Sequence, residues 1–155
     1  MGEKNLLFNE ELILLELKAT DWEEALNKMS ENLFEQKIVK ESFKNAVVNR
    51  EKEFSTGLQS SKIGVAIPHT DAEHVNVQAI SVAVLDKPVS FVHMGTADLP
   101  VEVEVIFMLA IKEPEGQLLL LQKLMDVFQK EEVLEKIRQS KDKKEILEIV
   151  TNEVM

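Results

Sequence analysis

The sequence predicts an α/β fold, a mixed β-sheet flanked by helices on both faces, and three observations lead to it. Apolar residues recur at helical spacing in the first and last thirds of the chain, whereas the middle alternates with the period of a strand. Residues 101–111 become apolar at successive positions, which is typical of a central strand covered on both faces. No stretch rich in glycine, proline or serine divides the chain. We therefore expect a single domain over residues 1–155, with its sheet between helices.

The first third of the chain predicts one short strand and two helices. Residues 12–17 form an apolar run that fits an edge strand. The string Thr20-Asp21-Trp22-Glu23 fits a capping box with its threonine as N-cap, and apolar residues at helical spacing follow it up to Leu33. A second helix is expected from about Glu41 to Glu51. Arg50 then lies near the C-terminal end of that helix, where the helix dipole favours a cation.

The middle of the chain predicts strands. Residues 63–67 fit a short strand that Pro68 ends. Residues 78–85 alternate, with larger apolar side chains on one face and small ones on the other, so a neighbouring element is expected to pack closely on the small face. Residues 89–92 fit another short strand, and residues 101–111 fit the central one.

The last third of the chain, after Pro114, predicts helices again. The first of them carries a wide apolar stripe that we expect to be core. The stripe consists of Leu118, Leu121, Leu124, Met125 and Phe128. Residues 133–137 predict a short helix, and residues 146–150 predict a final one.

The charge balance indicates which partners to expect. The net charge is −10 and the sequence pI is about 4.8, so nucleic acid and anionic membranes are not expected partners. A basic protein would be attracted, or the charge serves only to keep the chain soluble. No apolar run approaches the roughly 20 residues that cross a bilayer, and the N-terminus lacks a basic segment leading into an apolar one. We therefore expect a cytoplasmic protein without direct membrane insertion.

The residue content excludes several classes of site. The chain has no cysteine, which excludes disulfides, thiolate nucleophiles and cysteine-ligated zinc. Neither a Gly-x-Gly-x-x-Gly string nor a Walker lysine is present, so no nucleotide or other cofactor is expected. No metal is expected either, because none of His69, His74 and His93 has the tight spacing of paired ligands.

Residues 56–71 carry most of the chemical information. The expected strand ends at Pro68, and His69 follows at once. Proline fixes its own backbone and restricts the residue before it, so the imidazole of His69 is held at a stiff strand end. From these residues alone, His69 is either a reactive histidine or a structural one.

Reversible phosphorylation is the chemistry that this placement of a histidine favours. A neutral ring nitrogen is nucleophilic near pH 7, and the phosphoramidate that it forms is reactive enough to pass the group onward. Phosphoryl transfer otherwise depends on positioning and on neutralising charge. Arg50 is the leading candidate for the second task, because a guanidinium binds phosphate oxygens in a bidentate fork. The alternative for Arg50 is a solvated charge at a helix end.

Three segments of the chain resemble the signature of the fructose/mannitol-type IIA domains of the phosphoenolpyruvate-dependent sugar phosphotransferase system. They are Arg50-Glu51, Thr56-Gly57-Leu58 and Val65-Ala66-Ile67-Pro68-His69, in the order and at the spacing of that family. The resemblance extends over nearly the whole chain, from Asp21 to the last expected helix. It implies the same α/β fold, with helices flanking a mixed sheet.

The resemblance also implies a function and the roles of two residues. Members of this family accept phosphate from the small carrier HPr and pass it to a IIB component, which works with a membrane IIC component. By position, His69 is implied to be the phosphorylated residue, on Nε2, and Arg50 is implied to stabilise the transferred group. The chain is then expected to be a phosphotransferase component that needs no ATP.

One position departs from the resemblance. Mannitol and fructose members usually carry a second histidine early in the helix after the long strand, and Gln117 stands there in this chain. A site with two histidines is therefore not expected. Residues 67–75 and 106–111 look most like the galactitol-specific branch, which implies uptake of galactitol or a related polyol.

Four other polar residues receive a less specific interpretation. His74 either lines the site or lies on the surface, and we favour the surface. His93 is expected at a strand end or turn, without a role in the chemistry. Glu102 and Glu104 share a strand face, and we expect a solvated strand end there rather than a catalytic pair of carboxylates.

Two further functions stay open at this point. One is a regulatory protein of the same fold group, whose phosphorylation state controls binding to other proteins. The other is a non-catalytic α/β binding domain in which His69 is merely structural.

Overall fold

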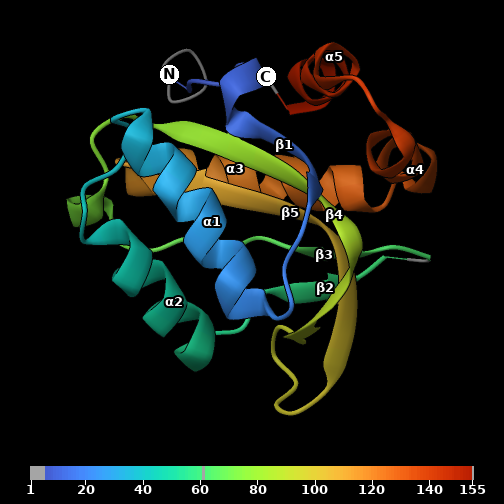
Figure 1. Ribbon diagram of the computed structural model, residues 1–155, viewed down its shortest axis with the longest axis horizontal. Coiled ribbons are helices and arrows are strands. Elements are labelled where there is room, and N and C mark those ends of the chain that lie inside the picture. Colours follow the sequence, from blue (N-terminus) through green and yellow to red (C-terminus); the bar gives the residue numbers. More distant parts are fainter. Residues whose placement is uncertain (1–5, 61, 155) are drawn as a thin grey trace.

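The computed structural model describes residues 6–60 and 62–154, and within them it has one five-stranded mixed sheet between two layers of helices (Figure 1). The strands are β1 (Ile13–Leu17), β2 (Gly57–Gln59), β3 (Gly64–Ala66), β4 (Ala79–Val92) and β5 (Pro100–Ala110). Their order in the sheet is β1-β4-β5-β3-β2. The β4–β5 and β2–β3 pairs are antiparallel, whereas β1 runs parallel to β4 and β3 runs parallel to β5.

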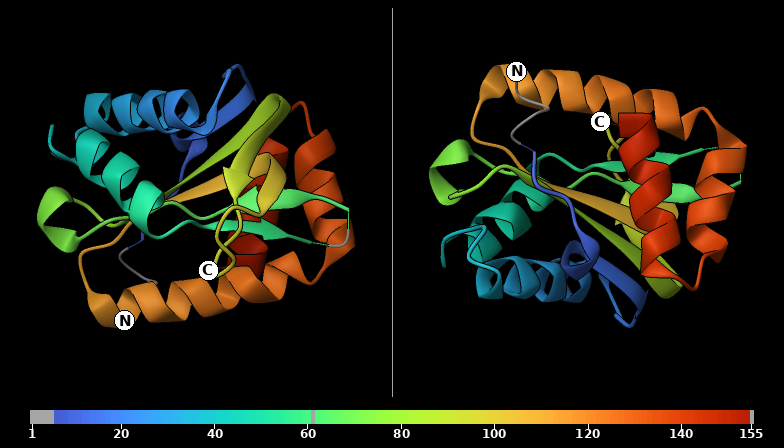
Figure 2. Two further views of the ribbon diagram at one scale, coloured as in Figure 1. Left: turned by 90° about the horizontal axis from the view of Figure 1, so that it is seen from below. Right: turned by 90° about the horizontal axis from the view of Figure 1, so that it is seen from above.

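Helices cover both faces of this sheet, as the two views of Figure 2 show. One face carries α1 (Trp22–Glu35) and α2 (Phe43–Glu53), and the other carries α3 (Pro114–Phe128), α4 (Glu131–Gln139) and α5 (Lys143–Val154). Two short 3-10 helices are η2 (Glu10–Leu12) and η3 (Ala72–His74). Within the described ranges, no helix has the length and apolar character to cross a membrane.

The alternation of side chains in β4 and β5 produces two separate cores. Ile80 and Val82 of β4 point into the core beneath α3, α4 and α5, whereas Ala79 and Ala83 point into the core beneath α1 and α2. The small residues let α1 approach the sheet closely, as the sequence predicted. β5 is buried on both faces from Val105 onward. The predicted fold class is therefore confirmed, together with β5 as a central strand and β1 as an edge strand.

The start of α1 lies one residue later than the predicted capping box. Asp21, not Thr20, is the N-cap, and its Oδ1 accepts a hydrogen bond from the backbone N–H of Glu24 at 2.8 Å. Glu24 reaches back instead of Glu23, and its Oε1 accepts from the backbone N–H of Thr20 at 2.6 Å. Asp21 and Glu24 have the same spacing as Thr20 and Glu23, one residue further along the chain. The carboxylate of Asp21 suits the positive end of the helix dipole better than the hydroxyl of Thr20 does.

The sequence predicted two separate strands at residues 78–85 and 89–92, but the structure has one long strand there, β4. The register shifts between Val84, which pairs with Val105, and Val89, which pairs with Val103. Four residues of β4 thus stand opposite one residue of β5, and this bulge contains Pro88. Proline has no backbone N–H to donate and would interrupt the pairing of a regular strand. At a bulge the ladder hydrogen bond is not required, so β4 continues through Pro88.

The apolar stripe predicted for α3 is partly wrong. Leu124 and Phe128 are buried as expected, but Leu118 is 61% exposed and Met125 is 39% exposed. The buried face is completed by Leu120 and Val127. Four consecutive leucines at residues 118–121 place leucine on every side of the helix, so spacing alone could not identify the face that packs.

Gly64 is required where β3 approaches β5. A Cβ atom at this position would overlap the backbone carbonyl of Glu102. We expect Gly64→Ala to lower the free energy of unfolding by about 3 kcal/mol, measured by urea denaturation, because a backbone carbonyl cannot move aside as a side chain can.

Gly95→Ala is the control for this prediction. Gly95 has φ +84° and open space around the added Cβ, so alanine there carries only backbone strain, about 1 kcal/mol. Equal effects of the two substitutions would contradict the proposed clash.

Candidate active site

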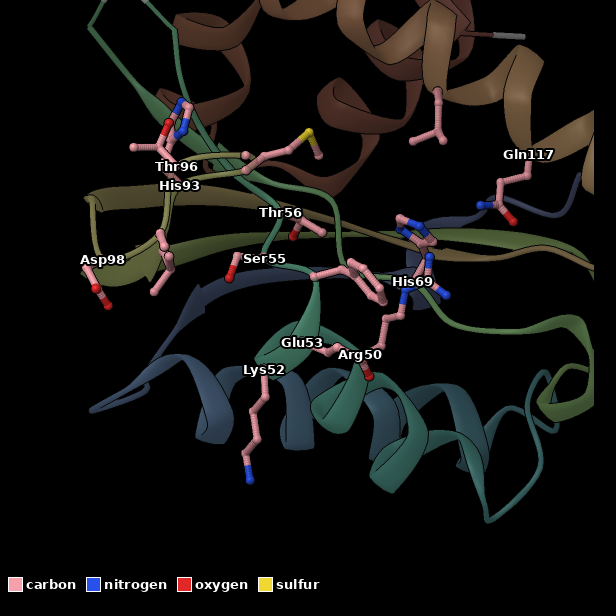
Figure 3. Close-up of a pocket in the computed structure, with 16 residues that line it drawn as sticks. Arg50, Lys52, Glu53, Ser55, Thr56, His69, His93, Thr96, Asp98 and Gln117 are labelled. Atoms are coloured by element: carbon pink, nitrogen blue, oxygen red, sulfur yellow. The ribbon is translucent and has the colours of Figure 1, made fainter.

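A cleft of about 780 Å³ opens beside the end of β3 (Figure 3). Its walls come from the C-terminal end of α2, from the connection between β4 and β5, and from α3. His69, Arg50 and Gln117 all line it. Residues that are far apart in the sequence thus meet at one place, and these include the two that the sequence singled out.

The backbone around His69 is anchored to the centre of the sheet. β3 ends at Ala66, and the buried residues Ile67 and Pro68 lead into His69. The carbonyl oxygen of Pro68 accepts a hydrogen bond from the backbone N–H of Leu109, on β5, at 3.0 Å. The imidazole of His69 is therefore half-buried and presented from a fixed strand end, which is the placement that the sequence predicted.

The ring of His69 has one nitrogen engaged by the backbone. Nδ1 lies 2.8 Å from the carbonyl oxygen of Ile67. A carbonyl can only accept, so Nδ1 carries the hydrogen and Nε2 of the neutral ring keeps its lone pair. Burial is the largest influence on the pKa of His69 and lowers it, and it outweighs the hydrogen bond to Ile67, which raises the pKa. The Arg50 cation lowers the pKa further, and the Asp71 carboxylate has the smallest effect, which is upward. At neutral pH the ring is therefore uncharged, with Nε2 as its nucleophilic atom.

We expect an NMR titration of His69 to give a pKa below its ordinary value of 6.5. Asp71→Asn removes a carboxylate that raises this pKa, so it should lower the pKa further, whereas Arg50→Gln should raise it. Because the folded pKa is depressed, the contribution of His69 to stability is complete above pH 6.5 and is lost as the pH falls below it. A titration midpoint at or above 6.5 would contradict this assignment.

Arg50 is held at the cleft by two contacts. Its Nη1 lies 3.6 Å from Oδ1 of Asp71, and its guanidinium carbon lies 5.0 Å from the centre of the Phe54 ring. The side chain of Asp71 is 70% exposed, so this ion pair is weak and an incoming anion can displace it. The stack on Phe54 keeps the guanidinium plane oriented meanwhile. Arg50 can therefore exchange a carboxylate for phosphate oxygens without leaving the cleft.

Glu51 is a buried carboxylate bonded to Thr56, which lines the cleft. No role for Glu51 was predicted from the sequence. Glu51 accepts two hydrogen bonds from Thr56, at 2.8 Å from the backbone N–H and at 2.8 Å from the hydroxyl. The backbone N–H of Ile67 in turn donates to Oγ1 of Thr56 at 3.2 Å. Glu51 and Thr56 both lie in segments that resemble the family signature, and this resemblance is the signal in the sequence that could have identified them.

Comparison with known proteins decides the family. The family described as "Phosphoenolpyruvate-dependent sugar phosphotransferase system, EIIA 2" matches residues 6–153. The chain belongs to this family. It is therefore a phosphotransferase component, as the resemblance implied.

Similar proteins include both sugar-specific EIIA components and a transcriptional regulator. The galactitol-specific EIIA component of Escherichia coli (strain K12) is 31% identical over 117 residues, which is 74% of this chain and 76% of that protein. The transcriptional regulator ManR of Bacillus subtilis is 30% identical over 104 residues, covering 67% of this chain but 14% of ManR. The solved complex of enzyme IIAMtl and phosphorylated enzyme IIBMtl from E. coli aligns over 95% of this chain and 99% of that chain, with a TM-score of 0.78 and 22% identity. It shares the fold.

Two further polar residues line the cleft of this EIIA chain. Gln117 lies on α3 facing the same space as His69 (Figure 3), where an amide cannot take up a phosphoryl group. His93, which was expected at a strand end or turn without a role, directly follows β4 and also lines the cleft, beside Thr96 and on the side away from His69. Its Nδ1 is buried and has no hydrogen-bond partner among the described residues.

The other polar candidates of this EIIA chain lie outside the cleft. Nδ1 of His74 is 2.8 Å from the hydroxyl of Ser42, away from the cleft walls. Glu104 pairs with Arg138 of α4 at 3.7 Å, Glu102 is exposed, and neither carboxylate lines the cleft. Within residues 6–60 and 62–154, no cluster of three or more potential metal ligands is present.

Proposed function

We propose that the chain is a IIA phosphocarrier that takes a phosphoryl group onto Nε2 of His69. The observation that carries this proposal is the bond from Nδ1 to the carbonyl of Ile67, which leaves the Nε2 lone pair free beside the same cleft as Arg50. The depressed pKa of His69 supports it, because a protonated ring has no lone pair with which to attack.

The reaction consists of two displacements at phosphorus. The Nε2 lone pair of His69 forms a bond to phosphorus as the bond to the donor breaks, and the electron pair of that bond stays with the donor. In the second step a nucleophile of the acceptor attacks, the bond between phosphorus and Nε2 breaks, and the lone pair returns to His69. Arg50 neutralises the phosphoryl oxygens in both steps.

The proposed donor is phospho-HPr and the proposed acceptor is a IIB component that serves a membrane IIC component. The mannitol IIA enzyme that shares this fold has been captured with phosphorylated IIB, which supports the acceptor. The system starts from phosphoenolpyruvate, so we place the chain in the cytoplasm. The similarity to the galactitol-specific component, together with Gln117 in the cleft, favours galactitol or a related polyol as the sugar.

A regulatory role is the second candidate, and the similarity to ManR favours it. In that role the phosphoryl group on His69 would control binding to another protein instead of passing to IIB. The two roles predict the same phosphorylated residue and different acceptors.

Phosphorylation of the wild-type chain tests the proposal. The chain is mixed with phosphoenolpyruvate, HPr and the enzyme that transfers the phosphoryl group from phosphoenolpyruvate to HPr, and phosphorus-31 NMR with peptide mapping locates the product. We expect one phosphoramidate, on Nε2 of His69, which then moves faster to a galactitol-specific IIB protein than to a mannitol-specific one. Absence of labelling, or labelling at another residue, would refute the phosphocarrier role. Labelling without transfer to any IIB protein would favour the regulatory role.

A further inference from the structure

One buried carboxylate has no part in the two displacements. Glu51 lies in the last turn of α2 and is only 4% exposed. Burial raises the pKa of its carboxyl group, although the two hydrogen bonds from Thr56 act in the opposite direction. The helix dipole also disfavours a negative charge at this end of a helix. Burial and the helix dipole thus both disfavour a charged carboxylate at this position, so Glu51 does not contribute to stability through its charge. Its hydrogen bonds indicate a different role.

The hydrogen bonds around Thr56 all run in one direction. A hydroxyl has one hydrogen, and Thr56 donates it to Oε1 of Glu51 at 2.8 Å. Oγ1 must then accept in any further bond, and it accepts from the backbone N–H of Ile67 at 3.2 Å. Donors therefore point from Ile67 through Thr56 to Glu51, where the carboxylate can only accept.

Ile67 is the residue whose carbonyl orients the ring of His69. Its N–H is held by Thr56, and the carbonyl of the next residue, Pro68, is held by Leu109 at 3.0 Å. Between these two anchors lies the Ile67 carbonyl that accepts from Nδ1 of His69 at 2.8 Å. A shift in the first anchor would move the acceptor that decides which ring nitrogen carries the hydrogen.

We propose that Glu51 is a positioning residue for phosphoryl transfer, acting through Thr56 and Ile67 to keep the hydrogen of His69 on Nδ1. The inference rests on the proposed role of His69 as phosphoryl acceptor. A neutral imidazole without a fixed partner exchanges between two tautomers, and the one with its hydrogen on Nε2 cannot attack phosphorus from that atom. The carboxylate thus keeps the whole population of His69 in its reactive form.

A pair of substitutions at Thr56 tests this in the full chain. Thr56→Val keeps the shape of the side chain and removes the hydroxyl, whereas Thr56→Ser keeps the hydroxyl and removes a methyl group. Nitrogen-15 NMR of the His69 ring reports the tautomer, and single-turnover transfer from phospho-HPr reports the rate. We expect Thr56→Val to mix the tautomers and to slow transfer roughly 10- to 100-fold. Thr56→Ser should restore the single tautomer and most of the rate.

Glu51→Gln provides an independent variant of nearly unchanged volume. It offers one oxygen to the two donors of Thr56, so we expect the same changes with a smaller size. If Thr56→Val does not fold, Glu51→Gln decides by the same two readouts. A folded variant with the wild-type tautomer and rate, even one less stable to heat, overturns the positioning role and leaves the proposed function intact. Labelling of the wild-type chain away from His69 overturns the proposed function instead.

Discussion

Replacing His69 by glutamine is expected to abolish phosphorylation of the chain. The amide of glutamine has no nucleophilic lone pair on nitrogen, but its NH₂ group can still donate to the carbonyl of Ile67 that now receives Nδ1–H. The fold should therefore survive while the acceptor atom is lost. We expect the rate of phosphate incorporation from phosphoenolpyruvate to fall by more than roughly 10³-fold, because losses of this size follow the removal of a catalytic nucleophile.

His74→Gln is the matched control for this experiment. It removes an imidazole that bonds to Ser42 outside the cleft, so its phosphorylation should proceed at the wild-type rate. The result that would contradict our assignment is a folded His69→Gln chain that still takes up phosphate at a rate close to that of the control.

The general arrangement of the fold could be predicted because periodicity reports burial directly. Strand alternation in residues 78–85 and the apolar run of β5 required a sheet with both faces covered, and the structure has one. The errors lie where local sequence offers two equivalent choices. Four consecutive leucines in α3 and two overlapping capping boxes at α1 are decided by tertiary packing or by a single hydrogen bond.

The candidate site could be predicted only in part, for a topological reason. The strand end that presents His69 is visible in the sequence, because proline stops the strand just before it. β2, three residues long, was not predicted, and its antiparallel pairing places Gly57 opposite Ala66. That register brings Thr56 beside Ile67 and so creates the link to Glu51. An isolated bridge between Gly57 and His93 likewise brings His93 to the cleft. Such contacts depend on pairing across the sheet, which no local pattern encodes.

Arg50→Gln is expected to slow phosphoryl transfer by roughly 10²- to 10³-fold, the usual effect of removing a preorganised group that stabilises charge. During transfer the phosphoryl group carries negative charge over three oxygens, and water screens this charge poorly inside the cleft. Arg50→Lys keeps the charge but loses the bidentate fork, so we expect an intermediate rate. The side chain of Arg50 is 36% exposed and its ion pair with Asp71 is weak. The free energy of unfolding should therefore change by less than about 1 kcal/mol.

Single-turnover transfer from phospho-HPr, measured beside urea denaturation, separates these two effects. Lys44→Gln on the same helix changes the net charge by the same amount, but Lys44 pairs with Glu31 rather than lining the cleft. It should accept phosphate at the wild-type rate, which would exclude a general effect of charge on the encounter with phospho-HPr. Equal losses of rate in both variants would mean that Arg50 acts through long-range attraction. A large loss confined to Arg50→Gln would mean that its guanidinium meets the phosphoryl group in the cleft.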